Sequence, residues 1–365
     1  MRARPVRIDQ VIPSIVERDA VSHHTLEAQR VLHSMGFVSE VYARNMGPGL
    51  QGRVHLLEEL PREGPEHQWV CYQASIGSPA AEAFASHPGL KLLDYHNISP
   101  AELVERWLPH LGEEVRLGRK QLAEMAPIVE LAFADSEFNR LELEEVGYRQ
   151  STVAPLMVDT TNFNCLPDER LVERFAKERA GGGHDWLFVG QMLPHKAHQD
   201  VIKAFACARK LFDPKARLHL VGRASCPAYA DALHRFATAL GLSRAVHFAG
   251  SVSAAELAAY YTSADVLVCC SDHEGFCAPL LEAMHHKLPI VAYGATAVPE
   301  TVLDAGIVLA SKSPVLVAAA VQRVLSDPGL RAQLIEAGLE RARAFSIEAA
   351  RRGFATAIER VLQAS

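Results

Sequence analysis

Two glutamates eight positions apart, Glu274 and Glu282, are the residues of this chain whose type and spacing best suit chemistry. An apolar segment at 266–270 precedes them and is short enough for a buried parallel strand. The segment from Ala278 to His286 is predicted to be a helix, with Pro279 in its first turn, where the missing N–H does no harm. Glu274 then lies in the loop after the strand and Glu282 lies one turn into the helix, so both side chains can point into one crevice.

The backbone between these two glutamates suits an anion. Free N–H groups and the positive end of a helix dipole attract phosphate at a helix start. A carboxylate on each side of that site fits a ligand with phosphate in the middle and hydroxyl groups at both ends, which describes a sugar nucleotide. The residues expected to contact such a donor here are Gly275, Phe276, Cys277, Ala278 and Leu280.

Other short segments match a known pattern in the same order along the chain. They are 94–100 (Asp-Tyr-His-Asn-Ile-Ser-Pro), 134–139, 188–196 (Phe-Val-Gly-Gln-Met-Leu-Pro-His-Lys), 246–253, 289–293 and 299–301. Together with the Glu-x7-Glu spacing, they resemble the retaining glycosyltransferases of the GT-B fold, family 4. The resemblance is dense between residues 184 and 310 and thinner before residue 90.

The resemblance implies roles for the two glutamates. Glu282 would bind the two ribose hydroxyls, because a carboxylate has two acceptor oxygens for a vicinal diol. Glu274 would contact hydroxyls of the donor sugar and is not expected to be a nucleophile, since retaining hydrolases need a second carboxylate about 5 Å away. The leaving phosphate itself would then take the acceptor proton on the same face. The structural alternatives are a glutamate that stabilises the helix dipole and a loop glutamate that faces water.

Lys196 follows a predicted strand end and is expected to neutralise the diphosphate without a metal. The resemblance adds Gly190, Gln191, Ser251 and Val252 as donor contacts. Family members usually have arginine where this chain has Gln191, and a neutral amide cannot replace that charge. Either Lys196 neutralises more of the diphosphate charge, or Arg223 after the next strand substitutes for the arginine, or the enzyme is slow. The structural alternative for Lys196 is a surface lysine.

The N-terminal half carries weaker candidates. In relatives, a histidine loop lies beside the donor sugar, and His96 occupies that place, where a neutral imidazole or its backbone carbonyl could support charge at the reacting carbon. The alternative is a structural turn histidine. Asn97 is a weaker candidate, and the region 17–24, with Asp19 and His23, is the expected acceptor contact.

Three further signals favour ordinary structure. The glycine pattern at 47–52 matches a dinucleotide motif but follows the wrong strand, so a turn-rich loop is expected. The histidines at 195 and 198 and the adjacent pairs at 23–24 and 285–286 do not form a zinc ligand set, so no metal is expected. The basic face with Arg116, Arg119 and Lys120 could favour a lipid-linked acceptor or a membrane surface, but a solvated helix face is the stronger interpretation.

Composition restricts the class of protein. Of 365 residues, 49% are hydrophobic and 22% charged, which is ordinary for a globular chain. A net charge of −6 argues against broad nucleic-acid binding. Seven cysteines without a C-x-x-C pair fit a reducing compartment. The first 19 residues contain no apolar run of a signal peptide, so a cytoplasmic protein is expected, with the inner membrane face as an alternative place of action.

Strands alternate with amphipathic helices from end to end, which predicts an α/β protein with two Rossmann-like parallel-sheet domains facing across a cleft, the GT-B fold. The expected division is an acceptor-binding domain at 1–157, a nucleotide-sugar-binding domain at 158–345, and a final helix at 346–365 that packs back on the first domain. Predicted strands are 6–12, 38–43, 69–73, 90–94, 131–134, 186–190, 217–221, 245–249, 265–270 and 289–292. Predicted helix caps are Ser22, Ser136, Ser253 and Ser346.

The sequence therefore predicts a metal-independent, retaining glycosyltransferase with a UDP- or GDP-sugar donor and a glycan, lipid-linked or small-molecule acceptor. It does not specify the sugar, base, linkage or oligomeric state. Two alternatives remain open: a GT-B-shaped epimerase or phosphorylase, and a sugar-nucleotide-binding partner subunit with weak activity. The second rests only on Gln191.

Overall fold

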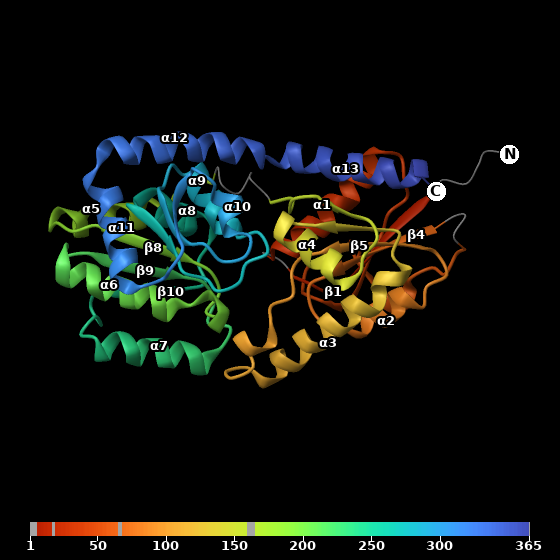
Figure 1. Cartoon of the computed structure of the whole chain (residues 1–365), viewed down its shortest axis with the longest axis horizontal. Coiled ribbons are helices and arrows are strands. Elements are labelled where there is room, and N and C mark those ends of the chain that lie inside the picture. The colour runs from red at the N-terminus through yellow and green to blue at the C-terminus, as the bar shows by residue number, and fades with distance from the viewer. Residues whose placement is uncertain (1–5, 17–18, 65–67, 159–164, 365) are drawn as a thin grey trace. The chain divides into compact units, whose positions relative to one another are not determined.

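The computed structural model describes residues 6–16, 19–64, 68–158 and 165–364 (Figure 1). The chain divides into two compact units. The first unit comprises Met1–Glu105, Pro109–Asp159 and Ser346–Ser365, and the second comprises Arg106–Leu108 and Thr160–Phe345. Each unit contains its own parallel sheet.

The described part of the first unit is built on a seven-stranded sheet of order β3-β2-β1-β4-β5-β6-β7 in which every pair is parallel. Its strands are β1 Arg7–Ile15, β2 Val41–Met46, β3 His55–Leu56, β4 Gln68–Ala74, β5 Leu90–Tyr95, β6 Leu131–Ala134 and β7 Ser151–Val153. Its helices are α1 Ala20–Ser34, α2 Pro79–Ala85, α3 Pro109–Met125, α4 Glu137–Val146 and α13 Ile347–Ala364, with short turns η1 Leu57–Glu59, η2 Ala101–Leu103 and η3 Ala126–Ile128.

Alternation along the strands sends apolar side chains to both faces of this sheet, as expected of buried parallel strands. On β4, Val70 and Tyr72 pack with side chains of α2, α3 and α4. Trp69 and Cys71 face the other way and pack with side chains of α1 and α13. The last helix of the chain thus completes the core of the first unit, where Phe354 lies against the Phe133 ring at a centroid distance of 5.2 Å.

The described part of the second unit contains a six-stranded parallel sheet of order β10-β9-β8-β11-β12-β13. Its strands are β8 Asp185–Val189, β9 Arg217–Val221, β10 Val246–Gly250, β11 Val266–Cys269, β12 Ile290–Tyr293 and β13 Gly306–Leu309. Its helices are α5 Glu169–Ala180, α6 His198–Leu211, α7 Pro227–Ala239, α8 Ala254–Ser263, α9 Ala278–His285, α10 Val298–Val302, α11 Pro314–Ser326 and α12 Pro328–Ala344, with the turn η5 Pro194–Lys196.

Several predicted helix ends are confirmed. Ser136 accepts from the N–H of Asn139 and begins α4, which ends at Gly147 in a left-handed conformation with φ of 110°. Ser253 and Glu256 form a reciprocal capping box at the start of α8. Caps of this kind are local in sequence, which explains why they could be predicted without the fold.

Other local predictions were wrong. The cap of α1 is Asp19 and not Ser22, because the Asp19 carboxylate accepts from the Ser22 N–H and Ser22 lies inside the helix. The second strand runs over Val41–Met46 instead of 38–43, with Val38 contributing only an isolated bridge. The strands β3, β7 and β13 at the edges of the sheets were not predicted. β3 and β7 are only two and three residues long and have weak patterns, whereas β13 has an apolar run that was not assigned to a strand. The glycine-rich segment 47–52 is a loop, as predicted.

Candidate functional site

The candidate site is built at the carboxyl ends of β8, β9 and β11, which lie side by side in the sheet of the second unit. In parallel α/β sheets, ligands bind at this edge. Gly222, directly after β9, has φ of +147°, and a Cβ placed there would lie 1.9 Å from the Gly190 carbonyl oxygen. A glycine is therefore required at this position for the loops after β8 and β9 to approach each other.

The loop after β11 is held by bonds to neighbouring segments. The Asp272 N–H donates to the His195 carbonyl at 2.7 Å. The Thr296 hydroxyl accepts from the Glu274 N–H and donates to the Glu274 carbonyl, both at 2.8 Å. The Thr301 hydroxyl donates to the Phe276 carbonyl at 3.0 Å. These contacts fix the backbone on both sides of Glu274.

The helix α9 begins immediately after this loop, as predicted, with Pro279 in its first turn. Its N-cap, Cys277, has a left-handed backbone with φ of 67°. Among the described residues, the N-cap makes no side-chain hydrogen bond to the first N–H groups of α9. The start of α9 therefore keeps its dipole and uncapped N–H groups for an anion.

Lys196 and Glu274 form an ion pair in this site. The Lys196 Nζ lies 2.8 Å and 2.7 Å from the two carboxylate oxygens of Glu274, whose side chain is only 7% exposed. Burial opposes the charge of Lys196, but the Glu274 carboxylate outweighs it and raises the pKa of Lys196 above its ordinary value. Two residues predicted separately are thus in direct contact, and Lys196 is charged at neutral pH.

Glu282 has a different partner. The Tyr261 hydroxyl of α8 donates to the Glu282 Oε2 at 2.5 Å. Burial raises the pKa of Glu282, while the bond from Tyr261 acts in the opposite direction. Glu282 lies in the second turn of α9, so the alternative of a first-turn residue that stabilises the helix dipole does not fit its position.

Gln191 and Arg223 lie together after β8 and β9. The Arg223 Nη2 donates to the Gln191 Oε1 at 3.4 Å, and the Ser225 hydroxyl donates to the same oxygen at 2.7 Å. Both Gln191 and Arg223 are exposed. The structure therefore places a guanidinium beside the position where family members usually have arginine. Ser251 and Val252, which follow β10, are exposed and half-buried.

His96 lies at the end of β5 in the first unit, and its side chain is 1% exposed. Its Nε2 lies 2.6 Å from the Gln73 Oε1, and its Nδ1 lies 3.1 Å from both oxygens of Asp135. Burial disfavours its charge, but Asp135 and Asp94 outweigh this and raise the pKa of His96 to about 9. These two buried carboxylates favour the protonated form of the ring, whereas the expected role needs a neutral imidazole, so that role stays a prediction. A role for the His96 backbone carbonyl in supporting charge at the reacting carbon also stays a prediction.

The other candidate residues of the first unit have hydrogen-bond partners within the same unit. The Asn97 amide donates to Asn139 Oδ1 at 2.8 Å, from a backbone with φ of 69°. The His23 Nδ1 lies 3.0 Å from the Met157 carbonyl. The Asp19 carboxylate caps α1. Their role as acceptor contacts stays a prediction.

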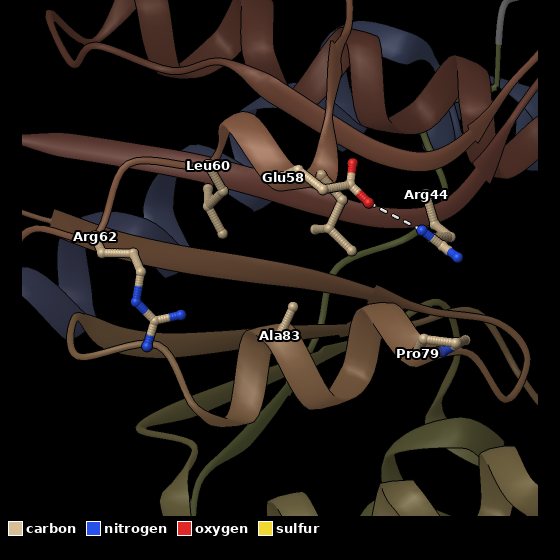
Figure 2. A pocket seen from close by; sticks show the side chains of 7 residues that line it. Arg44, Glu58, Leu60, Arg62, Pro79 and Ala83 are labelled. Carbon is tan, nitrogen blue, oxygen red and sulfur yellow. Dashed lines mark hydrogen bonds and ion pairs between the residues drawn. The ribbon is translucent and has the colours of Figure 1, made fainter.

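A cavity of about 390 Å³ lies in the first unit between β2, η1 and α2. Figure 2 shows the side chains that line it. Arg44 and Arg62 line it, and the Arg44 Nη1 donates to the Glu58 Oε1 at 2.9 Å. Among the residues that the structure describes, the predicted acceptor contacts do not line this cavity. Its lining combines charged and apolar side chains, and the sequence did not indicate it.

Sequence reasoning missed two side-chain clusters that the described residues form. His24, Asp94 and His96 gather in the first unit, and Cys269, Glu274 and Cys277 gather in the second. In each cluster, the ligand-type atoms lie within 4.8 Å of one another. The second cluster could have been noticed, because Cys269 and Cys277 repeat the eight-residue spacing of the two glutamates.

Two units, each with its own parallel sheet, and a charged site at the carboxyl ends of the strands of the second unit are typical of the GT-B fold. Residues 169–341, which lie within the second unit, match the family glycosyl transferases group 1.

Curated relatives agree with this family. The chain is 28% identical over 264 residues to a D-inositol 3-phosphate glycosyltransferase of Corynebacterium aurimucosum, covering 70% of this chain and 62% of that protein. It is 33% identical over 195 residues to a GDP-mannose-dependent alpha-(1-6)-phosphatidylinositol monomannoside mannosyltransferase of Mycolicibacterium smegmatis, covering 50% and 49%. The matches thus span less than two thirds of these relatives' lengths.

Solved structures show the same fold. The Anabaena HepE protein in complex with UDP superposes with a TM-score of 0.72 at 16% identity, covering 97% of this chain and 100% of that one. A sucrose-phosphate synthase from Thermosynechococcus elongatus gives 0.74 at 17% identity, covering 98% and 100%. Among the described helices, none combines the length and apolar character needed to cross a bilayer.

Proposed function

We propose that this protein is a retaining, metal-independent glycosyltransferase that moves a sugar from a nucleoside diphosphate to an acceptor hydroxyl. The observation that carries the proposal is the Lys196–Glu274 ion pair beside the uncapped start of α9. A cation, a set of amides and a carboxylate are the groups that a diphosphate and an adjoining sugar require.

Donor binding would exchange the partners of this ion pair. Lys196 turns from Glu274 to the diphosphate, so its charge remains neutralised. Glu274 then accepts hydrogen bonds from hydroxyls of the donor sugar. Because neither buried charge is left alone, the exchange avoids the penalty for breaking a buried ion pair.

Lys196, Arg223 and the amides of 275–278 would together stabilise the leaving diphosphate, which develops charge in the transition state. Arg223 supplies the guanidinium that Gln191 lacks, and its bond to Gln191 supports this substitution. The same contact favours an active transferase over a partner subunit with weak activity, since the missing charge is present on a neighbouring strand. The diphosphate oxygen that leaves the sugar takes the acceptor proton on the same face.

The nucleoside would bind through Glu282, whose carboxylate accepts from the two ribose hydroxyls, with Tyr261 holding it in place. UDP or GDP is the expected carrier. The HepE protein was solved in complex with UDP, and the Mycolicibacterium relative is described as GDP-mannose-dependent. Ser251 and Val252, after β10, are proposed contacts to the base.

The first unit would bind the acceptor through Asp19, His23 and Asn97, and the His96 backbone carbonyl stays a proposed catalytic group. A glycan, a lipid-linked sugar or a small polyol offers the required hydroxyl. The relatives named above act on inositol phosphate and phosphatidylinositol mannoside, which are hydroxyl-rich and anionic. Free cysteines are consistent with a cytoplasmic place of action, at or near the inner membrane face.

The test is a thermal-shift panel of UDP- and GDP-sugars followed by a transfer assay with the purified chain alone. A ligand at 100 times its dissociation constant stabilises the folded state by about 2.7 kcal/mol. The expected product retains the anomeric configuration of the donor and forms in the presence of a chelator. Transfer rates unchanged in both Glu274→Ala and Lys196→Ala would reject the site.

A further inference from the structure

Two cysteines that flank Glu274 in the sequence, Cys269 and Cys277, lie close to its carboxylate. Cys269 ends β11, and Cys277 is the residue before α9. Their sulfur atoms and a carboxylate oxygen of Glu274 all lie within 4.8 Å of one another. The three residues, named here the thiol–carboxylate cluster, are 5%, 7% and 7% exposed.

The backbone keeps this cluster assembled. Cys269 pairs with Ala292 in the sheet, which fixes one thiol on a rigid strand. Cys277 adopts a left-handed conformation with φ of 67°, which L residues other than glycine, asparagine and aspartate adopt rarely. Its carbonyl accepts from the Leu280 N–H at 3.0 Å, so the start of α9 holds that conformation. Both sulfurs are therefore preorganised beside Glu274.

Two thiolates and one carboxylate are ligands that a thiophilic d¹⁰ cation prefers, with water as a fourth ligand in a tetrahedral site. We propose that Cys269, Cys277 and Glu274 bind one such divalent cation, Zn²⁺ or Cd²⁺, and that its binding displaces Lys196 from Glu274.

The charges of this complex balance. Two thiolates and a carboxylate contribute three negative charges, and the cation contributes two positive ones. The third positive charge is that of Lys196, which leaves the Glu274 oxygens but also interacts with the Cys277 sulfur. Each thiol releases its proton to solvent as its sulfur binds the cation. No oxidant or reductant is needed. A neutral cluster is what a buried site tolerates best.

The consequence for activity rests on the proposed function. The Glu274 carboxylate cannot bind a cation and a donor sugar at the same time. Cys277 belongs to the turn that would bind the diphosphate. The cation would therefore inhibit transfer, and a bound sugar nucleotide would protect against it.

The chain offers matched controls for the cluster. Cys207 lies on α6 and packs against the apolar core of the second unit. Cys270 is next to Cys269 in sequence but packs into that core on the opposite face of the sheet. If the cation bound to any reduced cysteine, replacing Cys207 or Cys270 would weaken its binding as much as replacing Cys269.

The experiment titrates the reduced full-length chain with Cd²⁺ and follows the ultraviolet charge-transfer absorption of thiolate–cadmium bonds, with Zn²⁺ as competitor. We expect one Cd²⁺ per chain. Cys269→Ser and Cys277→Ser should each weaken binding by at least about tenfold, whereas Cys207→Ser should not change it. Thermal unfolding of each variant verifies that it is folded. Equal losses in Cys207→Ser, or unchanged binding in folded Cys269→Ser, would overturn the proposal.

Two further arms separate the parts of the proposal. Glu274→Gln should weaken Cd²⁺ binding by about tenfold or more, and unchanged affinity would reject the carboxylate as a ligand. In the transfer assay, Zn²⁺ should inhibit the unmodified chain reversibly, and a Cys269→Ser chain should need at least about tenfold more Zn²⁺. Cadmium binding without any sugar transfer would reject the proposed function alone, whereas transfer without cadmium binding would reject this site alone.

Discussion

The Lys196 Nζ and the Glu274 carboxylate, 78 positions apart in the chain, form a two-pronged ion pair with distances of 2.7 and 2.8 Å. One residue lies in the turn after β8 and the other in the loop after β11. Because these two strands are neighbours in the sheet, the pair joins two strand ends at the edge where ligands bind. It therefore holds the charges of the site in place before a donor arrives.

Removing either member of this pair should cost both stability and activity. Lys196→Ala leaves a buried carboxylate unpaired, and Glu274→Ala leaves a partly buried ammonium unpaired, so we expect a loss of roughly 1–3 kcal/mol in unfolding free energy. Transfer should fall by about 10²–10³ in kcat/KM for either variant. Chemical denaturation and initial-rate kinetics measure the two effects.

The double variant separates the two effects. With both charges gone, stability should recover relative to the single variants, whereas activity should stay low. Lys203→Ala is the matched control, since Lys203 pairs with Asp200 in the same unit but is 45% exposed, and it should change little. Strictly additive stability losses in the double variant would contradict a coupled pair.

Arg223 should contribute to diphosphate affinity. Arg223→Ala should weaken UDP or GDP binding by about 10- to 100-fold, because a charge-assisted hydrogen bond contributes roughly 1.5–3 kcal/mol. Adding Gln191→Arg to that variant should restore much of the affinity, since the two side chains lie in contact. Calorimetric titration measures the dissociation constants.

Arg244→Ala is the control for Arg223. Arg244 is also exposed, but it lines a cavity of about 410 Å³ near the amino end of β10. The candidate site lies at the other, carboxyl ends of the strands. An equal loss of affinity in this control would show a general charge effect instead of a local contact.

Glu282 should determine how strongly the site prefers a ribose. The unmodified chain should bind UDP or GDP about 10- to 100-fold more tightly than the 2′-deoxy form, and Glu282→Ala should abolish this preference. Tyr261→Phe should reduce the preference less, because it removes the bond that holds Glu282 but leaves the carboxylate. If Glu282→Ala kept the same ratio of dissociation constants, the side chain would have a structural role only.

The first unit should lose stability as pH rises above neutrality. The folded pKa of His96, about 9, lies above its ordinary value of 6.5, so the folded state binds this proton more tightly than the unfolded state. The resulting stabilisation is complete below pH 6.5 and is lost as pH rises through about 9. The expected loss is on the order of 2–3 kcal/mol.

Hydrogen exchange of β4–β6 amides, corrected for intrinsic rates, measures this loss. His96→Gln should flatten the pH dependence, since a neutral amide cannot pair with Asp94 and Asp135. His55→Gln, at a side chain 42% exposed in the same unit, should leave it unchanged. A pH slope that persists in His96→Gln would contradict the assignment.

Much of the fold could be predicted because its signals are local. The central strands have buried apolar runs, and β6 was predicted with the observed bounds, 131–134. The caps at Ser136 and Ser253 depend on residues three positions away. The edge strand β3 is only two residues long and lacks such a run, whereas the apolar run of β13 was not recognised as a strand. The cap at Asp19 was missed because Ser22 competes with it as a plausible cap.

The sequence by itself determined where the glutamates and the lysine lie along the chain: after strand ends and at a helix start, positions that residue type and periodicity reveal. Only the tertiary structure decided their partners. Glu274 pairs with Lys196, Glu282 bonds to Tyr261 21 positions away, and His96 turns inward to Asp135 39 positions away. Such contacts depend on which strands are neighbours and how side chains pack between them, and no local pattern encodes that information.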